Sequence, residues 1–385
     1  MPPQLNECIL RLLASLQLSI TTKAMLLLPL LTPQPRPAQA RRRAVSMGYA
    51  SSGYPEFDYE SAAALPKDKL RPPPPAAEVP SGLEAAMQGF DYSGASDDEV
   101  SSMAARLLEQ LKREATELTS SPLTAALAQR DVLRHDSLGN VVADVLAGKI
   151  CKSDQVGGGT DPNVQAQAMR ETMADAFSTP RVLRGLVADL IKCYVVDPAC
   201  DSLLQPVLFF KGFHAIQVYR VAHTLWRRGA GADQGAALLM QSRAAEVFSV
   251  DIHPAATIGN GVMLDHATGI VIGSTCILGD DIYMLHQVTL GATGRPTYGA
   301  KRHPSIGSGV TLGAGCTVLG DVTVNDGALV GASAIVTVDV PEKTTVVGVN
   351  KLVQRKDDDD DSADDYTWMY FSTTSERITF SESAI

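Results

Sequence analysis

Residues 306–336 read IGSGVTLGAGCTVLGDVTVNDGALVGASAIV, a stretch in which an aliphatic residue recurs at every sixth position. The recurring residues are Ile306, Leu312, Val318, Val324, Val330 and Val336. The same interval links Ile252, Ile258 and Leu264, and it also links Ile272, Leu278, Met284 and Leu290. A period of six fits neither an α-helix nor a hairpin, but it is typical of a parallel β-helix in which each hexad forms one side of a triangular coil.

The six-residue period is interrupted twice, after Leu264 and again after Leu290. The first interruption contains an Asp-His pair at 265–266, and the second contains an Arg-His pair at 302–303. Irregular segments on a rigid scaffold are common places for functional side chains. We therefore expect the functional site at these two breaks.

Composition limits the class of protein. The chain has 385 residues, of which 45% are hydrophobic and 20% charged, as expected for a soluble globular protein. Its net charge of −10 argues against nucleic acid as a partner, because such binding needs a basic face. No apolar stretch reaches the ~18 residues that span a bilayer, so no membrane partner is expected. The six cysteines form no CxxC pair and indicate no disulfide framework.

The first fifty residues differ from the rest, since Glu7 is their only acid while they carry six basic residues. This composition predicts an organellar transit peptide over 1–50, directing the protein to the chloroplast, with the mitochondrion as the alternative. A secretory signal with residues 24–31 as its core is the rival interpretation, but that core is short and interrupted by proline. Residues 51–95 are rich in Pro, Ser, Gly and Ala, which predicts a disordered spacer.

Helical periodicity dominates residues 96–248, and Ser96 and Glu99 have the spacing of a capping box at its start. Short β segments with glycine punctuation occupy 249–350, and an acidic flexible tail follows over 351–385. The sequence thus predicts an α+β chain, in which an N-terminal all-α helical domain precedes a left-handed parallel β-helix of hexapeptide repeats.

Titratable residues in and near the two breaks suit acid–base chemistry: Asp251, Asp265, His266, Arg302 and His303. A carboxylate beside a histidine stabilises the imidazolium, so such a pair can act as a general base toward a hydroxyl or an amine. Arginine can hold a carboxylate in a two-pronged contact. Each residue alone would be expected as surface charge, but their concentration in the two breaks favours a functional site.

Several strings in the chain resemble those of serine O-acetyltransferases, including the organellar forms of plants and algae. They are DIHPAA at 251–256, LDHATG at 264–269, VTLG at 288–291, RHP at 302–304 and KGFHA at 211–215. Two further strings, HDSLG at 135–139 and DPA at 197–199, are similar to the helical domain of that family. The resemblance covers residues from about 105 to 350.

The resemblance implies an acyltransferase that moves acetyl from acetyl-CoA to the hydroxyl of L-serine, directly within a ternary complex. It implies His266 as the general base and Asp251 as its orienting partner. The serine pocket would comprise Asp197, Asp265, Arg302 and His303, with the two carboxylates toward the substrate ammonium. Acetyl-CoA would lie along Gly291, Thr293, Gly294, Ala314 and Ala332, and no metal is implied.

The resemblance also implies partners: a homotrimer or a dimer of trimers, and O-acetylserine sulfhydrylase bound through the terminal Ile385. The chain departs from the family pattern at Ala292, where glycine is usual, and at Gly348–Lys351. It also carries an insertion at 152–165. These departures leave the strength of CoA binding and of cysteine inhibition open.

Three other interpretations stay open at this point. A γ-type carbonic anhydrase would use zinc held by three histidines, for which His266, His286 and His303 are available. Against it, such a site gives no role to Asp265 or Arg302. The acetyl acceptor could be another small molecule, such as a sugar, or the chain could be a scaffold that only holds the sulfhydrylase.

Overall fold

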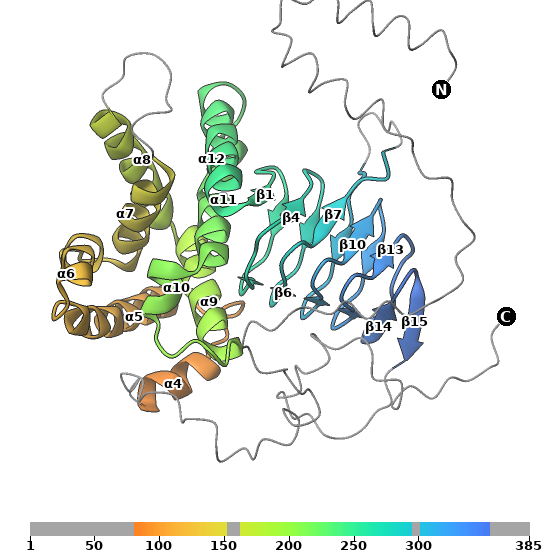
Figure 1. Ribbon diagram of the computed structural model, residues 1–385, viewed down its shortest axis with the longest axis horizontal. Coiled ribbons are helices and arrows are strands. Elements are labelled where there is room, and N and C mark those ends of the chain that lie inside the picture. Colours follow the sequence, from red (N-terminus) through yellow and green to blue (C-terminus); the bar gives the residue numbers. More distant parts are fainter. Residues whose placement is uncertain (1–80, 152–161, 295–300, 355–385) are drawn as a thin grey trace, which may run out of the picture. The chain divides into compact units, whose positions relative to one another are not determined.

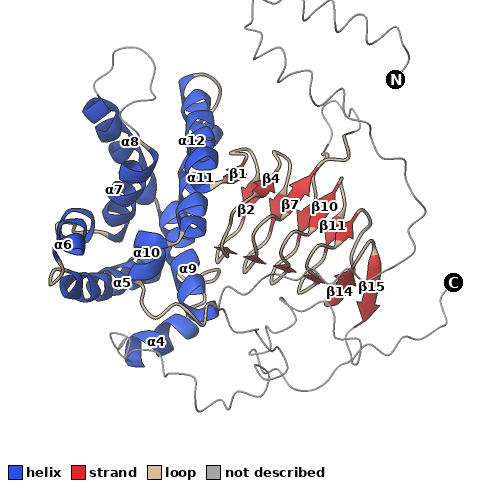
Figure 2. Ribbon diagram, in the orientation of Figure 1, coloured by secondary structure: helices blue, strands red, loops and turns tan. Residues whose placement is uncertain are grey.

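The computed structural model describes residues 81–151, 162–294 and 301–354, all of which belong to one compact unit, Pro72–Ile385 (Figure 1). The predicted transit peptide and Ile385 lie outside the described residues. Helices make up the first part of the described chain and strands the second (Figure 2), which confirms the predicted fold class.

The helical domain begins earlier than predicted. Its helices are α4 (Ser81–Gln88), α5 (Asp97–Leu118), α6 (Pro122–Ala128) with a π-helical turn (Gln129–Leu133), α7 (Leu138–Ile150), α8 (Pro162–Phe177), α9 (Pro180–Val196), α10 (Leu204–Phe209), α11 (Lys211–Arg228) and α12 (Ala232–Phe248). The capping box predicted at the start of α5 is confirmed, because the Glu99 carboxylate accepts from the Ser96 N–H at 2.7 Å. Helix α4, however, lies inside the predicted spacer 51–95, and it is ordered because Leu83 and Met87 are buried one turn apart.

Three sheets form the sides of the β-helix, and their strands are parallel except for the last strand of the third sheet. The first sheet contains β1 (Val250–Ile252), β4 (Ile270–Ile272), β7 (Thr289–Gly291), β10 (Thr317–Leu319) and β13 (Ile335–Val336). The second contains β2 (Thr257–Ile258), β5 (Ile277–Leu278), β8 (Ser305–Ile306) and β11 (Thr323–Val324). The third contains β3 (Met263–Leu264), β6 (Tyr283–Met284), β9 (Thr311–Leu312), β12 (Leu329–Val330), β14 (Thr344–Val347) and β15 (Lys351–Gln354).

The six-residue pattern corresponds to the core of this β-helix. Register pairs such as Ile252 with Ile272 and Leu264 with Met284 stack the repeating residues of successive coils. Every repeating aliphatic residue, from Ile252 to Val336, is buried, with an exposed fraction of 6% or less. The pattern ends before β15, which pairs antiparallel with β14 inside the segment predicted as the tail. Strand structure therefore extends to residue 354, so the predicted start of the tail at 351 is too early.

The turns between sheets form three corners. The first corner, between the first and second sheets, contains 253–256, 273–276 and the ends of the second break, 292–294 and 301–304. The second corner contains 259–262, 279–282, 307–310 and 325–328. The third corner contains 265–269, 285–288, 313–316 and 331–334. The two breaks in the period therefore fall on different corners.

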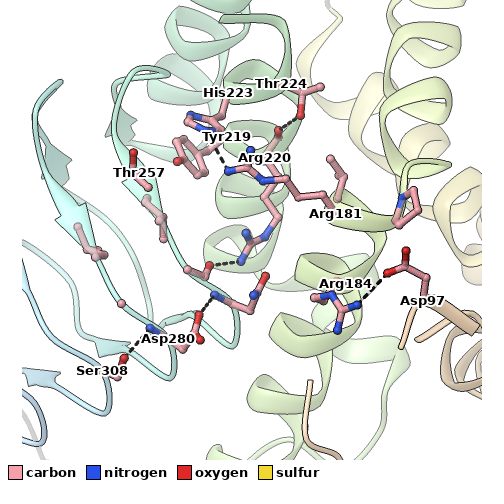
Figure 3. Close-up of a pocket in the computed structure, with 17 residues that line it drawn as sticks. Asp97, Arg181, Arg184, Tyr219, Arg220, His223, Thr224, Thr257, Asp280 and Ser308 are labelled. Atoms are coloured by element: carbon pink, nitrogen blue, oxygen red, sulfur yellow. Dashed lines mark hydrogen bonds and ion pairs between the residues drawn. The ribbon is translucent and has the colours of Figure 1, made fainter. Parts of the chain in front are cut away.

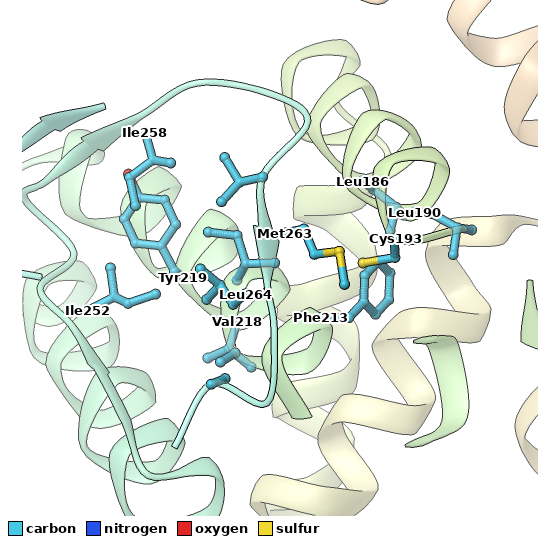
Figure 4. Close-up of a cluster of buried hydrophobic side chains, with 14 of the residues drawn as sticks. Leu186, Leu190, Cys193, Phe213, Val218, Tyr219, Ile252, Ile258, Met263 and Leu264 are labelled. Atoms are coloured by element: carbon cyan, nitrogen blue, oxygen red, sulfur yellow. The ribbon is translucent and has the colours of Figure 1, made fainter. Parts of the chain in front are cut away.

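The helical domain packs directly on the first coil of the β-helix. Apolar side chains of α9, α11 and the first coil form one buried cluster (Figure 4), which includes Leu186, Phe213 and Met263. Polar groups cross the same interface, since the Tyr219 hydroxyl donates to the carbonyl of Ala256 at 2.6 Å. The two parts of the chain thus share a continuous core.

Gly212, in the first turn of α11, sets how closely this helix approaches the β-helix. A Cβ atom at this position would lie 1.9 Å from the carbonyl oxygen of Leu264, the residue that precedes the first break. Only glycine allows this approach without a shift of backbone, because the obstructing atom belongs to the main chain.

We expect Gly212→Ala to lower the free energy of unfolding by about 1–3 kcal/mol, the usual cost of overpacking. Gly148→Ala is the matched control, since its Cβ would meet nothing within 4 Å and alanine favours a helix. Urea unfolding of both variants measures the effect. Equal stability of the two variants would contradict the close approach.

Candidate functional site

The backbone at His266 and Ala267 has an uncommon conformation. Their φ angles are 55° and 53°, in the left-handed region that non-glycine residues rarely adopt. Such residues cost roughly 1–3 kcal/mol each and persist only where the surrounding structure enforces them. Here the turn is closed by two short hydrogen bonds, from Ala267 N to the Asp265 carbonyl and from Thr268 N to the His266 carbonyl, both 2.6 Å.

Neighbouring elements hold this turn from two sides. The carbonyl of Thr268 accepts from Gln287 N of the next coil at 2.8 Å, and Gly269 N donates to the Ser249 carbonyl at 2.7 Å. From the helical domain, the Lys211 ammonium at the start of α11 donates to the Thr268 hydroxyl. The structure therefore fixes the His266 backbone while its side chain stays 69% exposed.

Asp265 lies beside the His266 ring. One of its carboxylate oxygens accepts from the Tyr283 hydroxyl at 2.9 Å, and the other is 3.7 Å from His266 Nε2. The Asp265 side chain is only 12% exposed, so its orientation is defined by these contacts.

Asp197 approaches the same corner from the helical domain. It is the C-cap residue of α9, and Ala199 N donates to its carboxylate at 2.8 Å. Partial burial raises the pKa of Asp197, and the nearby Asp265 carboxylate raises it further, while His266 acts in the opposite direction. The three predicted residues Asp197, Asp265 and His266 thus form one electrostatic cluster, named here the third-corner group.

The third corner continues through the next coils, which carry His286 and two of the residues predicted to hold acetyl-CoA. His286, one coil further on, packs against His266 in an edge-on contact with 6.0 Å between ring centres. Its carbonyl accepts from Gly315 N, and the carbonyl of Ala314 accepts from Ser333 N, so the turns stack in register. Ala314 and Ala332 are both half-buried on this corner.

The remaining predicted residues gather at the first corner. Burial lowers the pKa of His253, while the charge of Asp251 on β1 raises it and that of Arg302 lowers it further. His303 is buried, and its Nδ1 accepts from Thr275 N at 3.2 Å. Burial lowers the pKa of His303, with a further contribution from the Arg302 charge. Asp251, His253, Arg302 and His303 are named here the first-corner group.

The position of the His303 ring explains why residue 273 is glycine. A Cβ atom at Gly273 would lie 2.1 Å from the imidazole Cδ2, so the ring occupies the space that a side chain at this position would need. Of the other residues predicted to hold acetyl-CoA, Gly291 ends β7, and Thr293 and Gly294 lie in the corner loop that follows, where Gly294 has a φ of 76°.

The predicted site is therefore divided between two corners of one chain. Asp251 was predicted to orient His266, but within this chain its carboxylate accepts from the Gln241 amide at 2.6 Å. Three contributors were not predicted from sequence: Lys211, Thr268 and Tyr283. His286 was considered only as a possible zinc ligand, whereas its ring packs against His266. The one signal in the sequence for Tyr283 and His286 was their position in the coil that directly follows the first break.

Two further observations bear on the open interpretations. Within the described ranges, no three His, Cys, Asp or Glu side chains gather as a metal site would require. None of the described helices is both long and apolar enough to cross a membrane.

Comparisons with known proteins identify the family. Residues 107–218 match the family model described as serine acetyltransferase, N-terminal. The serine acetyltransferase of Escherichia coli K12 is 39% identical over 257 residues, which cover 66% of this chain and 89% of that protein. A rice (Oryza sativa subsp. japonica) relative is 40% identical over 276 residues, covering 72% of this chain and 86% of its own.

Solved structures agree with the sequence relatives. Soybean serine acetyltransferase complexed with serine superposes with a TM-score of 0.60 at 41% identity, covering 65% of this chain and 98% of that one. The Neisseria gonorrhoeae serine acetyltransferase gives a TM-score of 0.60 at 42% identity, covering 65% and 91%. On this sequence identity, coverage and shared architecture, the chain belongs to the serine acetyltransferase family.

Proposed function

We propose that the protein transfers the acetyl group of acetyl-CoA to the hydroxyl of L-serine, giving O-acetyl-L-serine and CoA in cysteine biosynthesis. The observation that carries the proposal is the exposed His266 ring on a fixed backbone turn, 3.7 Å from the Asp265 carboxylate, in a chain of this family. The soybean and Neisseria relatives have been solved in complex with serine, which supports this choice of acceptor.

His266 acts as the general base in this reaction. A serine hydroxyl is almost wholly protonated at neutral pH, so the proton must leave as the oxygen attacks the thioester carbon. The C–O bond then forms, the C–S bond breaks, and the proton passes from the imidazolium to the departing CoA thiolate. Both substrates are bound together, so acetyl transfers directly without an acyl-enzyme. Asp251 and Asp265 stabilise the imidazolium.

The serine pocket consists of Asp197, Asp265, Arg302 and His303. Burial raises the pKa of Asp197, and the positive charge of a substrate ammonium would act in the opposite direction and favour its carboxylate form. Arg302 offers the planar fork of donors that fits the substrate carboxylate. The substrate ammonium would thus contact carboxylates, and the substrate carboxylate would contact an arginine. A sugar acceptor carries neither charge, so this arrangement favours serine.

A second copy of the chain completes the site. The base and Asp265 lie on the third corner with Asp197 of α9 beside them, whereas Asp251, Arg302 and His303 belong to the first-corner group. One small substrate needs both groups, and a homotrimer that sets the third corner of one subunit against the first corner of the next supplies them. The same cleft would hold acetyl-CoA between Ala314 and Ala332 of one subunit and Gly291, Thr293 and Gly294 of the other. Two such trimers could pair through their helical domains.

The ends of the chain carry two further proposals. The composition of residues 1–50 supports import into the chloroplast, with the mitochondrion as the alternative. The acidic tail ending in Ile385 supports docking of O-acetylserine sulfhydrylase, with the terminal isoleucine as the anchor.

Replacement of His266 by asparagine should reduce kcat roughly 10²- to 10⁴-fold, the usual contribution of a general base. Thiol release from acetyl-CoA in the presence of L-serine measures it, with D-serine and a sugar as alternative acceptors. Binding of acetyl-CoA and the thermal midpoint should stay unchanged. Full activity in His266→Asn would refute the mechanism, and a preference for a sugar would refute the acceptor.

Mixed oligomers test the shared site. Neither His266→Asn nor Arg302→Ala should be active alone, but a trimer that contains both variants should regain about a third of wild-type activity, because one of its subunit boundaries joins an intact third corner to an intact first corner. Co-expression with two affinity tags isolates the mixed species for assay. Mixed oligomers without activity would show that both groups must come from one chain.

Lys211→Met should lower kcat roughly tenfold with little change in the KM for acetyl-CoA, because the turn that carries His266 loses its contact with α11. Lys211→Arg should restore most of the activity, and Lys112→Met on α5 is a control for the loss of a charge. A change confined to stability, with kcat intact, would contradict this role.

A further inference from the structure

A hollow of about 600 Å³ lies between the helical domain and the second corner of the β-helix (Figure 3). It is lined by the start of α9, by the middle of α11, and by residues 257–260 and 278–280. Both groups of the candidate active site lie on the other two corners. The hollow is therefore a separate feature that the acetyl transfer does not use.

Two of the three arginines in this hollow are neutralised by carboxylates. Arg184 pairs with Asp97 at 2.8 Å, and the buried Arg220 pairs with Asp189 at 2.6 Å. Arg181 differs, because none of the carboxylates in the described residues pairs with it. Its guanidinium reaches from α9 toward α11 and meets His223 Nε2 at 3.3 Å (Figure 3).

His223 holds this guanidinium without neutralising it. Its Nδ1 donates to the carbonyl of Pro254 at 2.8 Å, so Nε2 is the acceptor for Arg181 and the ring is neutral. Burial lowers the pKa of His223, and the charges of Arg181, Arg227 and Arg220 lower it further. This end of the hollow is consequently positive, with a guanidinium that is oriented by one N–H and has four others to donate.

The opposite end of the hollow carries a negative charge. The Asp280 carboxylate there accepts from Asn260 N at 2.7 Å and from the Ser93 hydroxyl at 3.0 Å. A bound anion would therefore be repelled from Asp280 and attracted to Arg181. Thr257, an exposed residue on the wall of the hollow, adds a hydroxyl donor to the lining.

We propose that this hollow binds a small molecule through a phosphate or sulfate group held by Arg181 and Thr257. Tetrahedral oxyanions suit the forked donors of arginine, which bind two oxygens at once. The volume is within the range of small-molecule sites and exceeds what one oxyanion fills, so there is room for an organic portion toward Asn260 and Ser308. The site does not depend on the proposed acetyl transfer.

The test uses the purified full chain and three probes: sodium sulfate, sodium phosphate and adenosine monophosphate. Thermal midpoints and titration calorimetry are compared with sodium chloride at equal ionic strength. Wild type should bind at least one probe, and Arg181→Gln should weaken that binding tenfold or more. Arg228→Gln, which removes an exposed charge outside the hollow, should bind as wild type does.

Tighter binding of the nucleotide than of inorganic phosphate would identify the ligand as a phosphorylated small molecule, and equal binding would identify the free ion. Thr257→Val should also weaken binding of the same probe, by a smaller factor. This second variant keeps the test decisive if Arg181→Gln is unstable. The proposal would be overturned if none of the probes binds or raises the thermal midpoint more than chloride does. Equal losses in Arg181→Gln and Arg228→Gln would overturn it as well.

Discussion

The inward packing of one aliphatic side chain at every sixth position is the constraint on which the rest of this structure depends. The coil is narrow, and residues such as Leu312, Val318 and Val330 have no exposed surface. Protein interiors are close-packed, so each coil must stack in register on the one before it. Register in the core aligns the corners, and it places His286 one coil beyond His266 and Ala314 one coil beyond His286.

The helical domain contributes to the site as well as to the core. Its α9 ends at Asp197 beside the His266 turn, and its α11 starts with Lys211 against the same turn. A buried ion pair fixes these two helices on the β-helix, because Asp189 accepts from Arg220 and also from Val262 N at 2.9 Å. Buried charges are tolerated when hydrogen bonds satisfy them, as they do here. A change in the docking of the helices would therefore alter the position of the His266 turn.

The division of the site between two corners follows from where the breaks fall. The first break lengthens the third corner and the second break lengthens the first corner, so a single prism presents the two groups on different edges. In the proposed reaction the substrate joins them across a subunit boundary. The strained turn at His266 fits this arrangement, since its exposed ring faces outward from a backbone that the fold has fixed.

The sequence by itself determined the periodic core, the order of the two domains and the residue types of the site, because a strict period and local motifs are one-dimensional signals. It did not reveal α4 or β15, whose burial and pairing depend on contacts with distant segments. Only the tertiary structure decided that Asp251 contacts Gln241 within its own chain, and that Lys211 and Tyr283 contact the His266 turn and Asp265. Those contacts depend on how the helices dock and how the coils stack, and no local pattern in the chain records either.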